Sequence, residues 1–96
     1  MTAPAWTPTV TAVIPTRDRP ELVRLAIASV LAQDYRGAIE VVVVADQTDP
    51  DPSLASDGPN REVRVVANRR TPGLAGARNT GLEEARGDLI AFCDDD

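Results

Sequence analysis

The sequence predicts an α/β domain with a mainly parallel sheet that is covered by helices. Short β-branched segments alternate with helical ones, in the order strand, helix, strand, irregular crossover, strand, helix, strand. Alternation of this kind is typical of parallel sheets, in which each crossover packs against a sheet face. The valine run at 41–44 supports the same class, because a strand buried on both faces has continuous apolar residues instead of an alternating pattern.

The first half of the chain contains a strand, a helix and a second strand. The apolar residues 10–14 predict the first strand. A helix follows, and Asp18 is its predicted N-cap because Glu21 lies three residues later, as in a capping box. The helix is expected to end near residue 33, and the second strand covers residues 39–45.

The second half begins with a segment that has no clear periodicity. Residues 50–60 are rich in Pro and Asp and predict a loop, with a short or irregular helix as the alternative. A third strand is predicted at 63–67 and a second helix at 75–86, with Gly87 as its C-cap. Residues 88–93 form the fourth strand, after which the sheet is expected to be truncated.

Composition excludes several classes of function. The 96 residues allow one small domain, and the net charge of −5 argues against a nucleic-acid surface. The chain has no His and all ten basic residues are Arg, so the usual zinc ligand and a lysine base are both missing. The single cysteine, Cys93, suits a reducing compartment, and a cytoplasmic location is expected.

No membrane segment or leader is predicted in this chain. No apolar run approaches the roughly 18 residues needed to cross a membrane. Residues 1–9 lack a basic region and an apolar core, so they predict a flexible lead-in and not a signal peptide. A longer parent protein could still associate with a membrane through other segments.

Three polar clusters fall at the ends of predicted strands. They occupy residues 16–18, 46–48 and 94–96, and the last is Asp94-Asp95-Asp96. In a parallel sheet all three open on the same edge, where ligands of open α/β sheets bind. Carboxylate oxygens are ligands that Mg²⁺ and Mn²⁺ prefer. The convergence therefore predicts a metal-assisted site, although an acidic end of the chain taken alone is equally typical of a solvated tail.

A glycine-rich segment at residues 73–81 leads into the second predicted helix. Such a helix start attracts phosphate through free backbone N–H groups, and Arg78 could add bidentate contacts to a diphosphate. The glycine spacing matches neither the dinucleotide fingerprint nor the Walker pattern. Arg78 as an ordinary surface residue of the helix remains the alternative.

Several motifs follow one another along the chain. They are Ala12-Val13-Ile14-Pro15-Thr16, Ala28-Ser29-Val30-Leu31-Ala32-Gln33, Val43-Val44-Ala45-Asp46, Gly73-Leu74-Ala75-Gly76-Ala77-Arg78-Asn79-Thr80-Gly81 and Gly87-Asp88-Leu89-Ile90-Ala91-Phe92-Cys93-Asp94-Asp95-Asp96. From Val10 onward this pattern resembles the N-terminal, nucleotide-sugar-binding part of glycosyltransferase family 2. The resemblance implies the GT-A fold, a Rossmann-like α/β/α sandwich, over residues 10–96.

The resemblance also implies roles for single residues. Asp46 matches the acid that accepts the N3–H of uracil, and Thr16 and Arg17 lie where the first strand lines the base and ribose pocket. Arg78 is placed near the diphosphate. The donor implied is a UDP-, GDP- or dTDP-sugar, and the acceptor is a saccharide or a lipid-linked glycan.

The acidic residues at 94–96 match the family's D-x-D motif. The resemblance implies Asp96 as the direct metal ligand, and Asp94 as a second metal contact. Asp94 and Asp95 would also reach the ribose or the metal-bound waters. The metal, Mg²⁺ or Mn²⁺, would bridge the two phosphates and neutralise charge as the nucleoside diphosphate leaves.

The chain departs from the family pattern at two places and lacks its second half. Ala45 replaces the first acid of the usual pair, and Arg17-Asp18 replaces the usual Tyr-Asn. The catalytic base that deprotonates the acceptor in an inverting transfer is expected beyond Asp96. The chain is therefore predicted to be a fragment that holds the donor site and is inactive alone.

Other classes of protein fit the residues less well. A receiver-like, non-catalytic module with a Mg²⁺-binding acidic cluster would need a lysine, which the chain lacks. A sugar-nucleotide pyrophosphorylase would have a glycine-rich loop directly after the first strand, where Pro15 and Thr16 stand here. An inert remnant, with a sheet edge exposed by truncation, remains open.

Overall fold

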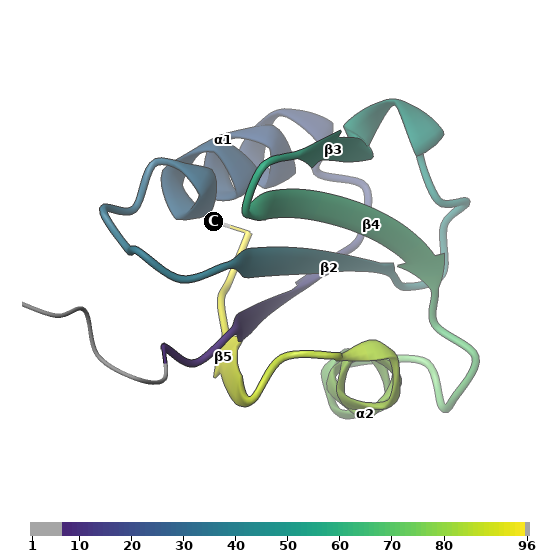
Figure 1. Cartoon of the computed structure of the whole chain (residues 1–96). Helices are drawn as coiled ribbons and strands as arrows, with labels where there is room; N and C mark the ends of the chain where they lie inside the picture. Colours follow the sequence, from purple (N-terminus) through teal and green to yellow (C-terminus); the bar gives the residue numbers. More distant parts are fainter. Residues whose placement is uncertain (1–6, 96) are drawn as a thin grey trace, which may run out of the picture.

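A computed structural model describes residues 7–95. One five-stranded sheet lies between two helices, in the strand order β3-β4-β2-β1-β5 (Figure 1). The elements, in chain order, are β1 (Val10–Thr16), α1 (Pro20–Leu31), β2 (Ile39–Ala45), the 3₁₀ turn η1 (Pro52–Leu54), β3 (Ser56–Gly58), β4 (Arg61–Ala67), α2 (Leu74–Glu84) and β5 (Leu89–Phe92).

Four of the five strands are parallel, which confirms the predicted α/β class. β1 pairs in parallel with β2 and with β5, and β2 pairs in parallel with β4. The C-terminal ends of these strands therefore lie on one edge of the sheet. The residues that follow β1, β2, β4 and β5 are brought together there.

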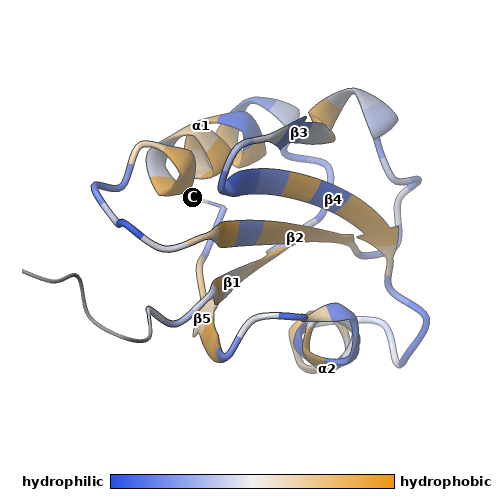
Figure 2. Cartoon of the chain, viewed as in Figure 1, coloured by the Kyte–Doolittle hydropathy of each residue, from blue (hydrophilic) through white to orange (hydrophobic). Residues whose placement is uncertain are grey.

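The core has two layers because successive strand residues face opposite sides of the sheet. On one face, Val41 and Val43 of β2 pack with Val23 and Ile27 of α1. On the other, Val42 and Val44 pack against Ala77 of α2. All four valines are fully buried, as predicted for a strand covered on both faces, and most of β2 has the colour of hydrophobic residues in Figure 2.

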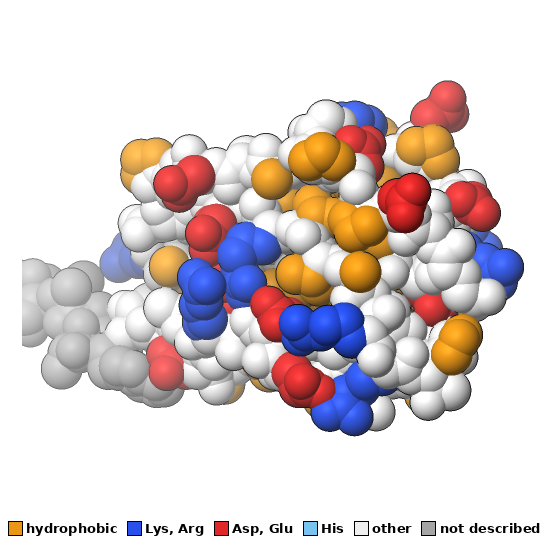
Figure 3. Space-filling view, turned by 90° about the vertical axis from the view of Figure 1, so that its right-hand side faces the viewer, with side chains coloured by type: hydrophobic (Ala, Val, Ile, Leu, Met, Phe, Trp, Pro, Cys, Tyr) orange, Lys and Arg blue, Asp and Glu red, His pale blue; other side chains and the backbone are white. Residues whose placement is uncertain are grey.

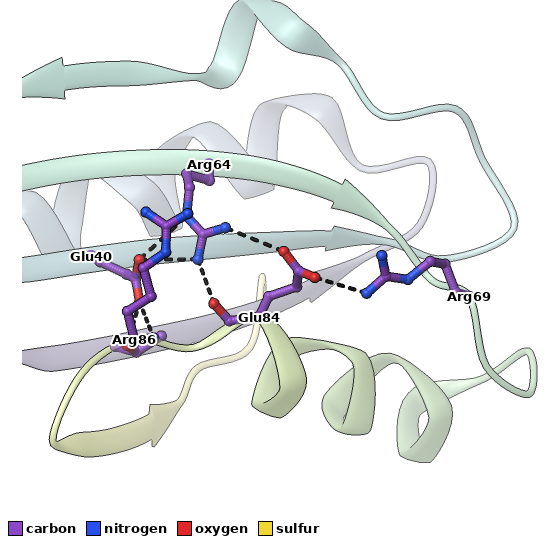
Figure 4. A network of polar contacts seen from close by, with 6 residues as sticks. Glu40, Arg64, Arg69, Glu84 and Arg86 are labelled. Atoms are coloured by element: carbon purple, nitrogen blue, oxygen red, sulfur yellow. Dashed lines mark hydrogen bonds and ion pairs between the residues drawn. The ribbon is translucent and has the colours of Figure 1, made fainter.

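A group of charged residues ties the end of α2 to the sheet (Figure 4). Arg64 of β4 forms ion pairs with Glu40 of β2 at 3.0 Å and with Glu84 of α2 at 3.3 Å. Glu40 also accepts hydrogen bonds from the Thr11 hydroxyl at 2.7 Å and from the backbone N–H of Arg86 at 2.6 Å. These contacts occupy the starts of the strands, at the opposite end from the polar clusters.

The prediction that the sheet ends after a fourth strand is wrong in its count, because the last strand, β5, is the fifth. The additional strand is β3, which pairs antiparallel with β4 inside the segment predicted as a loop. Its three residues are all exposed, so they show neither an apolar run nor an alternating pattern that a sequence analysis could detect. β4 likewise begins two residues earlier than predicted, at Arg61.

Both helices end earlier than predicted, and their caps differ. α1 has Arg19 at its N-cap position without a side-chain cap, so the capping box based on Asp18 is wrong. Asp18 instead adopts a positive φ of 52° in the loop. α2 ends at Glu84 with Ala85 as its C-cap, and Gly87 is not a cap. A Cβ on Gly87 would lie 2.7 Å from the backbone nitrogen of Thr11, so this glycine permits close approach to β1.

The described part of the lead-in touches the domain. The Tyr35 hydroxyl donates a hydrogen bond to the carbonyl oxygen of Pro8, and the backbone N–H of Thr9 donates to Asp88 at 3.0 Å. Residues 1–6, the rest of the predicted lead-in, lie outside the described residues. Within residues 7–95, neither helix has the length and apolar character needed to cross a membrane.

Candidate functional site

A pocket of about 400 Å³ opens at the C-terminal edge of the sheet. Its walls come from the end of β1, from the residues after β1, β2 and β5, and from the start of α2. They are Pro15, Thr16, Arg17, Arg19, Asp46, Leu74, Ala77, Asp94 and Asp95. Figure 3 looks onto this end of the molecule, where acidic and basic side chains surround a central apolar area.

Asp46 follows β2 directly and is buried, with 7% of its surface exposed. Its Oδ1 accepts a hydrogen bond from the side-chain amide of Asn68 at 3.0 Å, and Oδ2 accepts one from Gln47 at 3.2 Å. The backbone N–H of Gly73, at the start of α2, lies 3.2 Å from Oδ1 and 3.1 Å from Oδ2. Three donors therefore hold the carboxylate between β2 and α2.

The surroundings keep Asp46 ionised. Burial raises the pKa of the Asp46 carboxyl, but hydrogen bonds from Asn68, Gly73 and Gln47 and the charge of Arg17 together hold that pKa below its usual value of 3.8. At neutral pH the pocket thus contains a fixed anion that can accept a further hydrogen bond from a ligand.

Asp95 forms the opposite wall and joins the two ends of the chain. It is 8% exposed, and its Oδ2 accepts a hydrogen bond from the Thr16 hydroxyl at 2.8 Å. Arg19 forms an ion pair with Oδ1 at 3.3 Å. These contacts connect the end of β1 to the segment after β5, although the two residues of the hydrogen bond are 79 positions apart.

The carboxylates of the pocket suit a hard divalent cation. Asp94 is exposed and lines the pocket beside Asp95, while Asp96 lies outside the described residues. Among residues 7–95, no three acidic or sulfur ligands form a cluster that could enclose a metal. Mg²⁺ needs only one or two carboxylates when substrate phosphates supply other oxygens, so exposed Asp94 fits such a partial ligand set, while Asp95 is already held by Thr16 and Arg19.

The structure brings most of the predicted site residues to one place. Thr16, Arg17, Asp46, Asp94 and Asp95 all line the pocket, as the convergence of strand ends predicts. Arg78 does not line it. Its guanidinium carbon lies 5.7 Å from the centre of the Phe92 ring, and its buried Nε has no hydrogen-bond partner.

Sequence reasoning missed several residues of the pocket. Arg19 lies next to the cluster at residues 16–18, and Leu74 and Ala77 lie in the glycine-rich segment 73–81, but the sequence predicts none of the three as a pocket residue. Asn68 directly follows the end of β4. This position could have indicated a contact with the site, because Asp46 and the acids after β5 also directly follow the ends of strands. Nothing in the sequence indicates that Gly73 donates to Asp46.

Comparison with known proteins relates the whole described domain to one family. The family described as glycosyl transferase family 2 matches residues 11–96. The succinoglycan biosynthesis protein ExoO of Rhizobium meliloti (strain 1021) is 41% identical over 90 residues, covering 93% of this chain and 26% of that protein. An Escherichia coli protein, the UDP-Glc:alpha-D-GlcNAc-diphosphoundecaprenol beta-1,3-glucosyltransferase WfgD, is 31% identical over 87 residues, covering 91% of this chain and 34% of its own length.

A solved structure has the same architecture. It is the mannosyltransferase PcManGT from Pyrobaculum calidifontis in complex with GDP-Man and Mn²⁺, with a TM-score of 0.77 and 28% sequence identity. The match covers 96% of this chain and 28% of that one, so the chain corresponds to about a quarter of the length of such relatives. A family match over residues 11–96, with the sheet and the strand-end pocket in place, shows that the chain belongs to glycosyl transferase family 2.

Proposed function

We propose that this chain is the donor-binding part of a glycosyltransferase, and that its pocket binds a nucleoside diphosphate sugar together with Mg²⁺ or Mn²⁺. The observation that carries the proposal is the meeting of Asp46 with Asp94 and Asp95 in one pocket of a family 2 domain. One wall offers a buried hydrogen-bond acceptor, and the other offers metal-binding oxygens.

Each wall has a distinct part in the proposal. Asp46 accepts a hydrogen bond from the N–H edge of the nucleobase, and Thr16 and Arg17 line the part of the pocket that holds the base and the ribose. Asp94 and Asp96 hold the metal, and Asp95 contacts the ribose or metal-bound water. When bound, the metal neutralises the charge of the diphosphate leaving group. Arg78, predicted to reach the diphosphate, lies over the Phe92 ring and does not line the pocket.

The names of the relatives support this class of donor. One solved relative holds GDP-Man and Mn²⁺, and one curated relative is named for UDP-Glc and a diphosphoundecaprenol acceptor. We infer a UDP-, GDP- or dTDP-sugar as donor and a saccharide or lipid-linked glycan as acceptor. We expect the catalytic base beyond Asp96. We infer a cytoplasmic location from the single cysteine.

Thermal unfolding of this chain with and without UDP, GDP or dTDP, each with Mn²⁺, tests the proposal. A ligand at 100 times its Kd that binds only the folded state adds about 2.7 kcal/mol to the free energy of unfolding, so the Tm should rise. The rise should need Mn²⁺ and should be lost in Asp46→Asn. Asp57→Asn removes the same charge from the exposed strand β3 and should leave the rise intact.

Two results would count against the donor site. A cooperative transition that none of the three nucleotides moves would favour a structural remnant without a binding function. An equal rise in wild type and in Asp46→Asn would place the nucleotide elsewhere on the chain.

A further inference from the structure

Asn68 lies at the edge of the pocket, and all of its backbone and side-chain N–H groups donate hydrogen bonds. Its backbone N–H donates to the carbonyl oxygen of Ala45 at 2.9 Å, which places it beside the end of β2. Its side-chain nitrogen donates to Oδ1 of Asp46 and to the carbonyl oxygen of Thr71, both at 3.0 Å. An amide nitrogen has two protons, so both are used.

The orientation of this amide is fixed by two hydrogen bonds to its oxygen, one from α2 and one from the loop before α2. The Thr80 hydroxyl donates to Oδ1 of Asn68 at 2.8 Å, and the backbone N–H of Arg70 donates to the same atom at 3.0 Å. Thr80 is almost completely buried, with 1% of its surface exposed. Two donors on the oxygen allow only one direction for the nitrogen, which is toward Asp46.

Asp46 needs hydrogen-bond donors because it is buried, and Asn68 is one of them. A buried carboxylate loses its hydration and needs hydrogen bonds in exchange. Of the charged groups at the pocket, Arg17 favours the ionised form, while Asp94 and Asp95 belong to the opposite wall and Asp95 is paired with Arg19. Asn68 is one of three neutral donors to this carboxylate, with Gly73 and Gln47, and its bond to Oδ1 is the shorter of the two bonds to that oxygen.

We propose that Asn68, held in one orientation by Thr80, is a positioning residue of the nucleotide pocket that directs the Asp46 carboxylate toward the nucleobase. The inference rests on the proposed donor-binding function and adds a specificity role to residues outside the strand-end clusters. Asn68 and Thr80 do not line the pocket themselves, so they would act through Asp46.

Two measurements on this chain test the proposal. The first is the pKa of the Asp46 carboxyl, followed by NMR of its ¹³C-labelled carboxyl carbon. The second is the affinity for UDP and GDP compared with that for pyrophosphate, each with Mn²⁺, by calorimetry. Pyrophosphate has no base, so it reports damage to the rest of the pocket.

In Asn68→Ala the pKa of Asp46 should rise, because a hydrogen bond to the charged form is lost while burial remains. The affinity for whichever nucleotide the wild type binds should fall by about tenfold, as expected if a misdirected Asp46 loses its hydrogen bond to the base, and pyrophosphate affinity should not change. Thr80→Val should give a smaller rise in pKa, because Arg70 still donates to Asn68. Thr80→Ser keeps the hydroxyl and should behave as wild type.

An unchanged Asp46 pKa in both Asn68→Ala and Thr80→Val would overturn the proposal. An equal loss of nucleotide and pyrophosphate affinity would also overturn it, because that pattern indicates general damage. If Asn68→Ala does not fold, the Thr80→Val and Thr80→Ser pair still decides. If the wild type binds no nucleotide, the donor-site proposal fails, and the specificity role of Asn68 fails with it. The NMR titration separately reports whether Asn68 lowers the pKa of Asp46.

Discussion

At the residue scale, the absence of a side chain sets the distance between α2 and the sheet. A Cβ on Gly81 would lie 2.2 Å from Cγ1 of Val13, which is fully buried on β1. A Cβ on Gly76 would lie 1.8 Å from the carbonyl oxygen of Thr71, which belongs to the loop that places Gly73 beside Asp46. Both glycines therefore determine whether α2 can bring its first turn to the pocket.

Replacing Gly81 should test this close approach. In Gly81→Ala the added methyl must displace Val13, and overpacking of this kind costs about 1–3 kcal/mol of unfolding free energy. Stability is measured as the midpoint of urea-induced unfolding, compared between variants that have the same m-value. Gly58→Ala is the matched control, because its Cβ would meet only the carbonyl oxygen of Arg61, at an ordinary 3.5 Å. Equal stability of the two variants would mean that α2 moves away from the sheet without cost.

At the scale of elements, one arginine on β4 joins two strands and a helix. Arg64 is 19% exposed in its side chain and pairs with Glu40 and Glu84, which are 12% and 23% exposed. Arg69 also pairs with Glu84, at 2.7 Å, but is 62% exposed. Solvent screens the Arg69 pair, so the two arginines should differ in their contribution to stability.

Truncation of each arginine separates these contributions. Arg64→Ala leaves the largely buried Glu40 without its charged partner and should cost about 2 kcal/mol, below the range for fully buried pairs. Arg69→Ala should cost about 0.5 kcal/mol or less. Chemical unfolding of the two variants side by side gives the comparison. A larger cost for Arg69 would contradict the assignment of Arg64 as the joining residue.

The same network should make the fold sensitive to acid. Burial raises the pKa of Glu40, but the Thr11 and Arg86 hydrogen bonds and the Arg64 charge hold it below 4.5 overall. The Arg69 hydrogen bond is the main cause that lowers the pKa of Glu84. Because the folded pKa values are depressed, their stabilisation is present above about pH 4.5 and is lost as pH falls through the folded values.

A charge-removing variant isolates the contribution of Glu40. Glu40→Gln should be less stable than wild type at pH 7, and its stability should fall less steeply between about pH 5 and pH 3. Urea midpoints across this range provide the measurement. Parallel pH curves for the two proteins would show that Glu40 does not contribute through its charge.

At the scale of the whole molecule, the two edges of the sheet differ. The β3 edge is short and polar, whereas all four residues of β5 are exposed and three of them are large and apolar: Leu89, Ile90 and Phe92. An exposed apolar edge strand can pair with a second copy. We therefore expect this chain to self-associate through β5 as its concentration rises.

A lysine on the edge should weaken that association. Ile90→Lys should lower the apparent mass in sedimentation velocity at high concentration, because a charge on an edge strand opposes pairing. Leu25→Lys makes the same chemical change on α1, where Leu25 is 67% exposed, and should not lower it. A concentration-independent monomer for the wild type would remove the basis for this prediction.

The class of fold and most of the pocket residues follow from the amino-acid sequence alone. Continuous and alternating apolar residues report burial locally, and parallel strands place their C-terminal ends on one edge, so Thr16, Asp46 and Asp95 could be expected to meet without coordinates. Those three residues line one pocket in the structure. Their roles in binding remain predictions.

Which neighbours complete the site depends on contacts between segments that are distant in sequence. Asn68 reaches Asp46 across 22 positions and Thr16 reaches Asp95 across 79, and no local pattern encodes such pairs. The same holds for Arg78 over Phe92, for the short strand β3 and for Gly87, whose role is to approach β1 closely. Periodicity records which face of an element is buried, while the partner on that face depends on packing between distant segments.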